Sequence, residues 1–242
     1  MFVLAQKEIR GFFGSITGYL VISVFLVINS LFLWIFDSGF NIPDGGYAGI
    51  DGLFFISPWV FLFLIPAVTM RLFSEEFRLG TIAILKTRPL TDLQIIAGKW
   101  LAGITLVIIA LIPTLIYYFS VYALGETPGN IDSAGTLGSY IGLLFLAAAY
   151  VSMGLFASAL SDNPIIAFLI GMLFCFILYF GFDQLAGVFS SSKTQLFISG
   201  LGMNEHYASM SRGVIDSRDV VYFLSIIVLF TIPTQWILKN RV

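Results

Sequence analysis

Six long, predominantly apolar stretches of the sequence constrain the fold more than any other feature. They contain no Asp, Glu, Lys, Arg or His, and each can cross about 30 Å of hydrocarbon as a helix. Their apolar residues do not alternate with polar ones, which favours helices over barrel strands. The expected spans are residues 16–36, 53–70, 100–124, 137–160, 165–182 and 220–238.

The composition agrees with a membrane protein. Charged residues make up 11% of the 242 residues and apolar residues 58%, whereas about 25% of a soluble domain is charged. We therefore expect an all-α integral membrane protein in which residues 1–242 form one transmembrane domain. The single cysteine, Cys175, excludes a disulfide within the chain.

The positive charges predict the orientation. Nine of the twelve Lys and Arg residues lie in the N-terminal segment, in the connection 71–99 and after the last span. The other three, Lys193, Arg212 and Arg218, share one loop. The positive-inside rule places both termini and residues 71–99 in the cytoplasm, as an even number of spans requires.

Residues 1–15 are expected to form an interfacial amphipathic helix. At helical spacing one apolar face gathers Phe2, Ala5, Ile9, Phe13 and Ile16, and Lys7 and Arg10 lie away from it. The alternative is a polar start to the first span. A cleavable signal peptide is not expected, because a full-length span follows without a small-residue cleavage site.

Residues 71–99 hold five of the twelve Lys and Arg residues. On a helix, Phe73, Phe77, Gly80 and Ile84 share one face, and Arg71, Glu75, Arg78 and Lys86 share the other. Gly80 is expected to interrupt the helix, Pro89 to end it, and Thr91 with Gln94 to form a capping box. We interpret the segment as a docking surface for a cytoplasmic partner; the alternative is a solvated connector.

Residues 183–219 form the longest expected extracytoplasmic element. Residues 196–203 are apolar but too short to cross, which favours a re-entrant or interfacial piece. A short helix is predicted over residues 204–212, with Gly213 as its stop and Asp216 as the N-cap of the last span. His206 is interpreted as an exposed loop residue.

Several kinds of activity lack their residues. His206 is the only histidine, which excludes a histidine metal cluster, and no Asp, Glu, Lys, Arg or His lies within the expected spans to carry protons. Sodium coupling through unwound backbone stays open. No G-x-x-x-x-G-K-[ST] loop is present, so any ATP hydrolysis must come from another subunit.

Residues 74–89 read S-E-E-F-R-L-G-T-I-A-I-L-K-T-R-P, and residues 96–102 read I-A-G-K-W-L-A. This stretch resembles the signature of ABC-2 type permeases, E-[EK]-[RF]-x-x-G-T-[IL]-x-x-[IL]-L-x-x-P followed by G-K. The resemblance implies a permease that works with a second permease subunit, itself or a paralogue. Two separate ATPases would bind ATP and Mg²⁺, and this chain would bind no cofactor. The coupling residues it implies are Arg71, Phe73, Glu75, Glu76, Phe77, Arg78, Gly80, Thr81, Arg88 and Pro89.

Residues 204–223 read N-E-H-Y-A-S-M-S-R-G-V-I-D-S-R-D-V-V-Y-F. They resemble the H-[FY]-x-x-[FM]-x-R-G-V-I-D-x-R-D-V-x-Y-F stretch of the gliding-motility ABC permeases, the GldF type. This implies a bacterial inner-membrane protein with a GldA-type ATPase and a GldG-type membrane partner that carries a large outside domain. The matching residues in the extracytoplasmic element are His206, Arg212, Gly213 and Asp216.

The first hypothesis is therefore a permease subunit that couples ATP hydrolysis to export or to force transmission. Two alternatives stay open: an exporter of the drug, lipid or copper-site-assembly type, and a structural anchor that recruits a cytoplasmic partner without transport. The lipid bilayer is an expected partner, and neither a nucleic acid nor a metal ion is.

Overall fold

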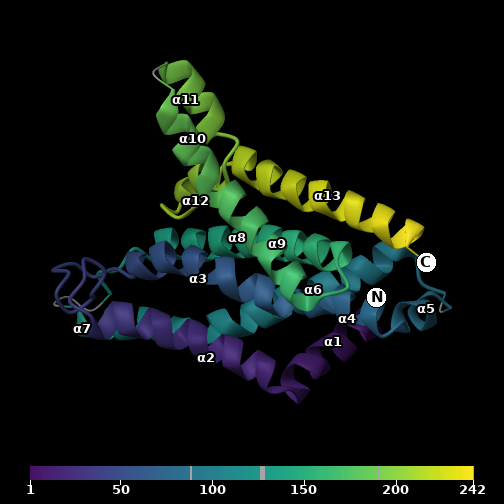
Figure 1. Cartoon of the computed structure of the whole chain (residues 1–242). Coiled ribbons are helices and arrows are strands. Elements are labelled where there is room, and N and C mark those ends of the chain that lie inside the picture. The colour runs from purple at the N-terminus through teal and green to yellow at the C-terminus, as the bar shows by residue number, and fades with distance from the viewer. Residues whose placement is uncertain (88, 126–128, 190, 242) are drawn as a thin grey trace.

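The computed structural model describes residues 1–87, 89–125, 129–189 and 191–241, and in these ranges the secondary structure is helical (Figure 1). Six helices of the described chain are long and apolar enough to cross a membrane. They are Ile16–Ile35, Asp51–Arg78, Asp92–Leu124, Ser133–Leu160, Pro164–Gly187 and Ser217–Asn240. The predicted all-α fold with six spans is confirmed.

The helices follow one another along the chain, and the longest connection among them is residues 36–50, between η1 and α3. Their bounds are α1 Phe2–Gly14, α2 Ile16–Ser30, η1 Leu31–Ile35, α3 Asp51–Thr69, α4 Arg71–Arg78, α5 Thr81–Lys86, α6 Asp92–Leu111, η2 Ile112–Thr114, α7 Leu115–Leu124, α8 Ser133–Leu160, α9 Pro164–Phe176, η3 Ile177–Gly181, α10 Phe182–Val188, α11 Ser192–Ser199, α12 Met203–Met210 and α13 Ser217–Asn240.

Helix α8 forms the centre of the bundle. It packs against α3, α6, α9 and α13, and 78% of its most apolar stretch is buried, against 22% for each of the spans that contain α9 and α13. Small residues allow close packing: a Cβ at Gly103 of α6 would lie 2.9 Å from Cγ1 of Val151. The inner helices thus form a packed core, and α9 and α13 present most of their surface to the surroundings.

The two ends of the bundle differ. Figure 1 shows α1, α4, α5 and both chain ends gathered at one end, whereas α10 and α11 project away from the body. Gathering the segments that carry most of the positive charge at one end is the arrangement that the positive-inside rule requires. The direction of this end, toward the cytoplasm, stays a prediction.

Two charged residues near the starts of spanning helices are buried. The third spanning helix starts at Asp92 and the last at Ser217, as the predicted caps Thr91 and Asp216 require. Lys99 and Asp219 lie inside these helices, and both are buried. Their burial was not predicted, because hydropathy alone cannot anticipate a charge that is paired within the fold.

Helix α1 uses its apolar residues differently from the expectation. Leu4, Ala5 and Phe12 are buried, and α1 packs on α6 and α2, whereas Phe2 stays 76% exposed. The face expected to lie entirely on lipid is therefore shared between the protein and the surroundings. The placement of α1 at the membrane interface stays a prediction.

Candidate functional site

The α4–α5 segment begins where α3 passes into α4 beside α8. The Ser158 hydroxyl of α8 accepts hydrogen bonds from the backbone N–H groups of Phe73 (3.0 Å) and Ser74 (3.1 Å) and donates one to the Met70 carbonyl (2.7 Å). Amide groups at a helix start have no partner within the helix, so this buried serine supplies one. The base of the segment is thereby fastened to the centre of the bundle.

Gly80 separates α4 from α5. Its φ of 69° is left-handed, a conformation in which glycine has no Cβ penalty. Helix α5 ends before the exposed, non-helical Pro89, and Thr91 caps α6: Gln94 N–H donates to Thr91 Oγ1 (3.3 Å), and Thr91 N–H to Gln94 Oε1 (3.1 Å). The predicted break and capping box are confirmed.

Four charged side chains meet where α1, α4 and α6 come together; we name Lys7, Glu8, Glu76 and Lys99 the Lys99 cluster. Lys99 Nζ lies 2.9 Å from Glu76 Oε1 and 3.0 Å from Glu8 Oε1. Lys7 Nζ lies 3.0 Å from the same Glu8 oxygen and 3.2 Å from that of Glu76. Two ammonium groups and two carboxylates therefore alternate across three helices.

Lys99 is the buried member of this cluster, with 0% of its side chain exposed. A buried ammonium group is costly unless its hydrogens are accepted. Besides the two carboxylates, the Leu72 carbonyl accepts at 2.6 Å, and the Phe73 ring lies 5.1 Å from Nζ. Glu76 Oε2 is buried without a hydrogen-bond partner among the described residues, so this carboxylate depends on Oε1 for its contacts.

The cluster changes the ionisation of its outer members. Burial favours neutral Glu8, but the charges of Lys99 and Lys7, with their hydrogen bonds, outweigh it and lower the pKa of Glu8. Burial likewise disfavours charged Lys7, but Glu8 and Glu76 raise its pKa overall. Both shifts mean that the charged, paired state is stabilised by the fold.

Gly98 explains how α1 comes so close to α6. A Cβ at Gly98 would lie 3.1 Å from the Met1 carbonyl oxygen and 3.2 Å from a Leu4 methyl group. The next residue, Lys99, then reaches Glu8 one helical turn along α1. Gly98 thus allows the close approach of α1 to α6, and the adjacent Lys99 forms the ion pair between the two helices.

A second group of contacts joins the segment to the end of α13. The Arg241 guanidinium lies over the Phe77 ring at 4.8 Å and donates to Asp162 Oδ1 (2.9 Å) and to the Ala159 carbonyl (3.2 Å). Lys86 Nζ donates to the Leu238 carbonyl. The segment is therefore held on two sides, by the Lys99 cluster and by α13.

The predicted docking face does not remain together in the structure. Phe73 is fully buried, Phe77 is partly buried beside Arg241, and Glu76 turns inward to Lys99. Arg71 and Glu75 pair at 3.5 Å and are 50% and 37% exposed. Arg88 lies outside the described residues.

The segment is most exposed around the turn between the two helices, and we name residues 78–81, 83 and 84 the docking tip; Ile82, between them, is buried. Arg78 and Thr81 are exposed, and so are the apolar Leu79 (68%) and Ile84 (65%). Leu79 was missed because the left-handed Gly80 breaks the continuous helical pattern from which the face was predicted. The signal that could have found it is its position immediately before that glycine.

The element predicted to be extracytoplasmic contains α10, α11 and α12. The apolar run 196–203 is divided between the end of α11 and the start of α12 by a turn at residues 200–202, and its re-entrant or interfacial placement stays a prediction. The predicted helix near 204–212 is present as α12, and Asp216 caps α13 by accepting from Arg218 N–H at 2.9 Å. Arg212 is exposed and bonds the Ala208 carbonyl of its own helix.

Gly213 does more than end a helix. Its φ is 83°, and a Cβ there would collide with Gly135 of α8, while a Cβ on Gly138 would lie 2.7 Å from the Gly213 Cα. The chain after α12 therefore crosses α8 at a contact between glycines.

His206 is not the exposed loop residue that was expected, since 19% of its side chain is exposed. Nδ1 lies 2.7 Å from Asp219 Oδ1, Nε2 lies 3.0 Å from the Gly200 carbonyl, and the ring stacks on Tyr222 at 3.9 Å. Because a carbonyl only accepts, Nε2 carries a hydrogen. No sequence pattern predicted this pairing, which joins the end of α11 to α12 and α13.

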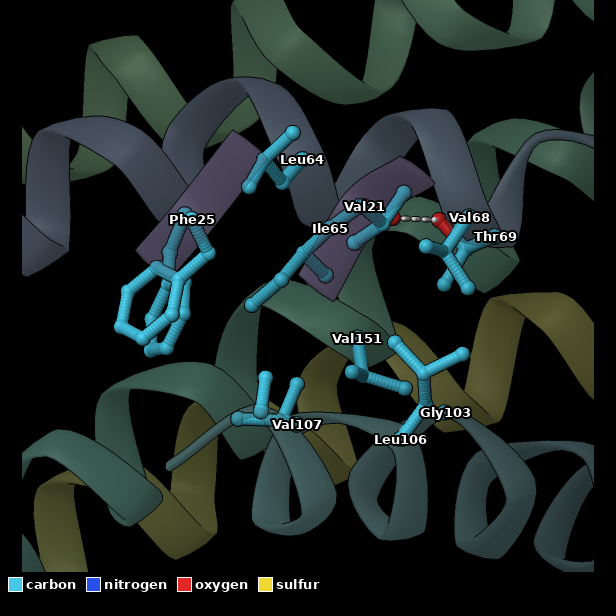
Figure 2. A pocket seen from close by; sticks show the side chains of 12 residues that line it. Val21, Phe25, Leu64, Ile65, Val68, Thr69, Gly103, Leu106, Val107 and Val151 are labelled. Carbon is cyan, nitrogen blue, oxygen red and sulfur yellow. Dashed lines mark hydrogen bonds between the residues drawn. The ribbon is translucent and has the colours of Figure 1, made fainter. Parts of the chain in front are cut away.

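The space between the central helices is small. Figure 2 shows side chains from α2, α3, α6 and α8 converging on it, among them Phe25, Ile65, Val107 and Val151. The cavity is about 10 Å³, which is at the lower limit for a single water molecule. In this conformation the centre of the bundle has no room for a cargo.

The described residues include no group of three His, Cys, Asp or Glu side chains that could hold a metal ion.

The family model described as ABC-2 family transporter protein matches residues 50–241, which include every helix from α3 to α13. No curated protein matches the chain. Members of this family are non-catalytic membrane subunits that pair with an ABC ATPase. With six candidate spans and this match over most of its length, the chain belongs to the ABC-2 family of transporter membrane proteins.

Proposed function

We propose that this chain is the permease subunit of a transporter in a bacterial inner membrane, with both termini in the cytoplasm. A separate ATPase would dock on the α4–α5 segment, and its closure on ATP would move the spans. Within the family we favour the gliding-motility GldF type, because residues 204–223 resemble its sequence. Export or force transmission would then involve a GldA-type ATPase and a GldG-type partner.

The exposed docking tip is the observation that carries the proposal. Leu79, on the turn, and Ile84, on α5 just after it, are apolar and more than 60% exposed, beyond the spanning part of α3. Helix α4, before the turn, is fixed by Ser158 and by the Lys99 cluster, and α5, after it, is held by the hydrogen bond of Lys86 to the Leu238 carbonyl. An exposed apolar turn on a braced base suits a partner that must push on it, because little of the motion would be lost in the segment itself.

The packing of the helices supports a cargo route along the surface of the chain. The central cavity is about 10 Å³, whereas an apolar groove of about 450 Å³ lies on the side of the bundle between α2 and α3. A transport path would therefore run along the surface of the chain, where a second permease subunit, itself or a paralogue, would complete it. This arrangement suits an apolar or amphiphilic cargo, or force transmission without a cargo.

Charge reversal in the segment tests the docking. The ion pair of Arg71 with Glu75 is exposed, so it contributes only about 0.2–1 kcal/mol to stability. Reversal at an interface, in contrast, places like charges against the partner and can cost several kcal/mol of association. Glu75→Arg and Arg78→Glu should therefore leave the amount of this chain in the membrane near normal and abolish co-purification of the ATPase. The ATPase is recognised by mass spectrometry as a co-purified protein whose sequence contains a phosphate-binding loop.

The matched control is Asp44→Arg, a reversal in the loop between η1 and α3. It should leave ATPase binding unchanged. If both segment reversals retain full binding and ATPase activity, residues 71–99 are only a solvated connector. A chain that binds a cytoplasmic partner but never alters its ATP hydrolysis would instead be a structural anchor.

A further inference from the structure

The end of α13 meets the α4–α5 segment at two separate places, one on each helix. Arg241 lies over Phe77 of α4, and Lys86 of α5 donates to the backbone of α13. These contacts join residues more than a hundred positions apart in the sequence. They make the end of α13 a direct neighbour of the segment on which the ATPase is proposed to act.

The contact of Lys86 uses a group that a helix end leaves free. The last four carbonyls of an α-helix have no partner within it, and Leu238 is among these residues of α13. A lysine ammonium group satisfies such a carbonyl and complements the negative end of the helix dipole. The side chain of Lys86 is 22% exposed and that of Leu238 is fully buried, so this contact lies at the base of the segment.

The contact of Arg241 involves three elements. Its guanidinium group touches the Phe77 ring of α4 at 4.8 Å and donates to the Ala159 carbonyl at the end of α8 and to Asp162 in the turn before α9. The planar group can hold a ring on its face and oxygens at its edge at the same time. A displacement of Phe77 would therefore be felt by α13 and by the α8–α9 turn.

Helix α13 packs along α8, and most of the rest of its surface is exposed. Only 22% of its most apolar stretch is buried, against 61% for the span that contains α3 and α4. The contacts of Lys86 and Arg241 join its C-terminal end to the α4–α5 segment as well.

From these contacts we propose that Lys86 and Arg241 are positioning residues that transmit the motion of the α4–α5 segment to α13. The inference rests on the proposed function, because it takes the ATPase as the source of the motion. It adds a specific route: α13 follows the segment through side-chain contacts, although the two are far apart along the chain. Neither residue touches cargo or nucleotide.

The test measures the movement of α13 in the assembled complex. Spin labels are attached to cysteines placed at Trp236 of α13 and Val27 of α2, both exposed, in a Cys175→Ala background. Labelled chains are diluted with unlabelled ones so that distances within one chain are read. The label-to-label distance is recorded with and without ATP and Mg²⁺, and the amount of co-purified ATPase is measured in the same samples.

The wild type should show an ATP-dependent change in distance. Lys86→Met with Arg241→Gln should lose more than half of this change and retain the ATPase, whereas Lys86→Arg with Arg241→Lys should keep most of it. Lys239→Gln removes a charge from the same end of α13 and should behave as the wild type. If the double variant inserts poorly, Arg241→Gln alone should still reduce the change.

Two results would overturn the inference alone. One is a full ATP-dependent change in the Lys86→Met, Arg241→Gln variant; the other is an unmoved α13 in a wild-type complex that contains active ATPase. Failure of any ATPase to join the wild-type chain would instead remove the proposed function, and this inference with it. The two failures are therefore distinguishable.

Discussion

The Lys99 ammonium group lies 2.9 Å from a Glu76 carboxylate oxygen, and the Lys99 side chain is completely buried. Through this contact, and the one to Glu8 at 3.0 Å, α6 is joined to α4 and to α1. Only 11% of the residues in this chain are charged, so a fully buried lysine is unusual in it. Substitution of Lys99 should show how much the stability of the α4–α5 segment depends on this ammonium group.

We expect Lys99→Met to destabilise the protein by about 3–5 kcal/mol, because two largely buried carboxylates lose their common partner. Thermal unfolding in detergent would measure the loss. Replacing the carboxylates as well, with Glu8→Gln and Glu76→Gln, should recover much of it, since an uncharged site no longer contains unpaired charge. Equal stability of Lys99→Met and wild type would show that the cluster contributes nothing.

The pH dependence of α1 follows from the pKa shifts. The lowered pKa of Glu8 stabilises the fold above the ordinary value of 4.5, and this contribution is lost as the pH falls through the folded-state pKa. The raised pKa of Lys7 stabilises the fold below 10.5, and its contribution is lost at higher pH. A spin label at Gln6 should therefore gain mobility in acid.

Glu8→Gln is the control for this acid transition. The neutral side chain cannot titrate, so the variant should show a smaller change in label mobility over the same pH range. An unchanged transition would mean that groups other than Glu8 cause the gain in mobility of the label in acid.

Phe73 and Leu79 lie six positions apart in sequence and should behave in opposite ways. Phe73→Ala removes a fully buried ring and should cost about 3–5 kcal/mol of stability. Leu79→Ala removes a side chain that is 68% exposed and should change stability little but weaken ATPase binding. Parallel thermal unfolding and co-purification would measure both, and loss of stability without loss of binding in Leu79→Ala would contradict the docking tip.

His206→Ala should loosen the joint between α11 and α12. The buried Asp219 carboxylate would lose its hydrogen bond, and its second oxygen already has no partner among the described residues. We expect a loss of about 1–3 kcal/mol and faster proteolysis near Gly200 and Gly202. Lys193→Gln on exposed α11 is the control, and equal cleavage of both variants would show that His206 does not hold the joint.

The orientation can be tested with single cysteines in a Cys175→Ala background. A cysteine at Ser192 should react with an impermeant thiol reagent added outside intact cells, and one at the exposed Thr87 should not. The reason is the predicted excess of Lys and Arg on the cytoplasmic side. Reaction of the Thr87 cysteine from outside would overturn the proposed orientation.

Local patterns predicted the local structure well. The six spans, the Gly80 break, the Thr91 capping box and the Asp216 cap each depend on residues close together in sequence. The predicted common apolar face was wrong because it placed residues on both sides of Gly80 on one helix, although Gly80 was itself expected to interrupt it. A left-handed glycine rotates the residues after it, so Phe73 and Ile84 do not share a surface.

The contacts that hold the candidate site could not be predicted from the sequence. Lys99 meets Glu8 across 91 positions, and Lys86 meets the Leu238 carbonyl across 152. In the sequence, Lys99, Glu8 and Lys86 look like ordinary charged residues next to a span. Their partners are decided by how the helices pack. His206 and Asp219 are closer, 13 positions apart, but the intervening turn decides that they meet.

The tight centre of the bundle has a consequence for the membrane itself. Protons and small ions cross a bilayer along files of water or chains of titratable groups, and the roughly 10 Å³ between α2, α3, α6 and α8 cannot hold such a file. In this conformation the interior between these four helices therefore offers no route for ion leakage. Any leak through an assembled transporter would have to run between its subunits, where the charge-free outer faces of the spans disfavour ions.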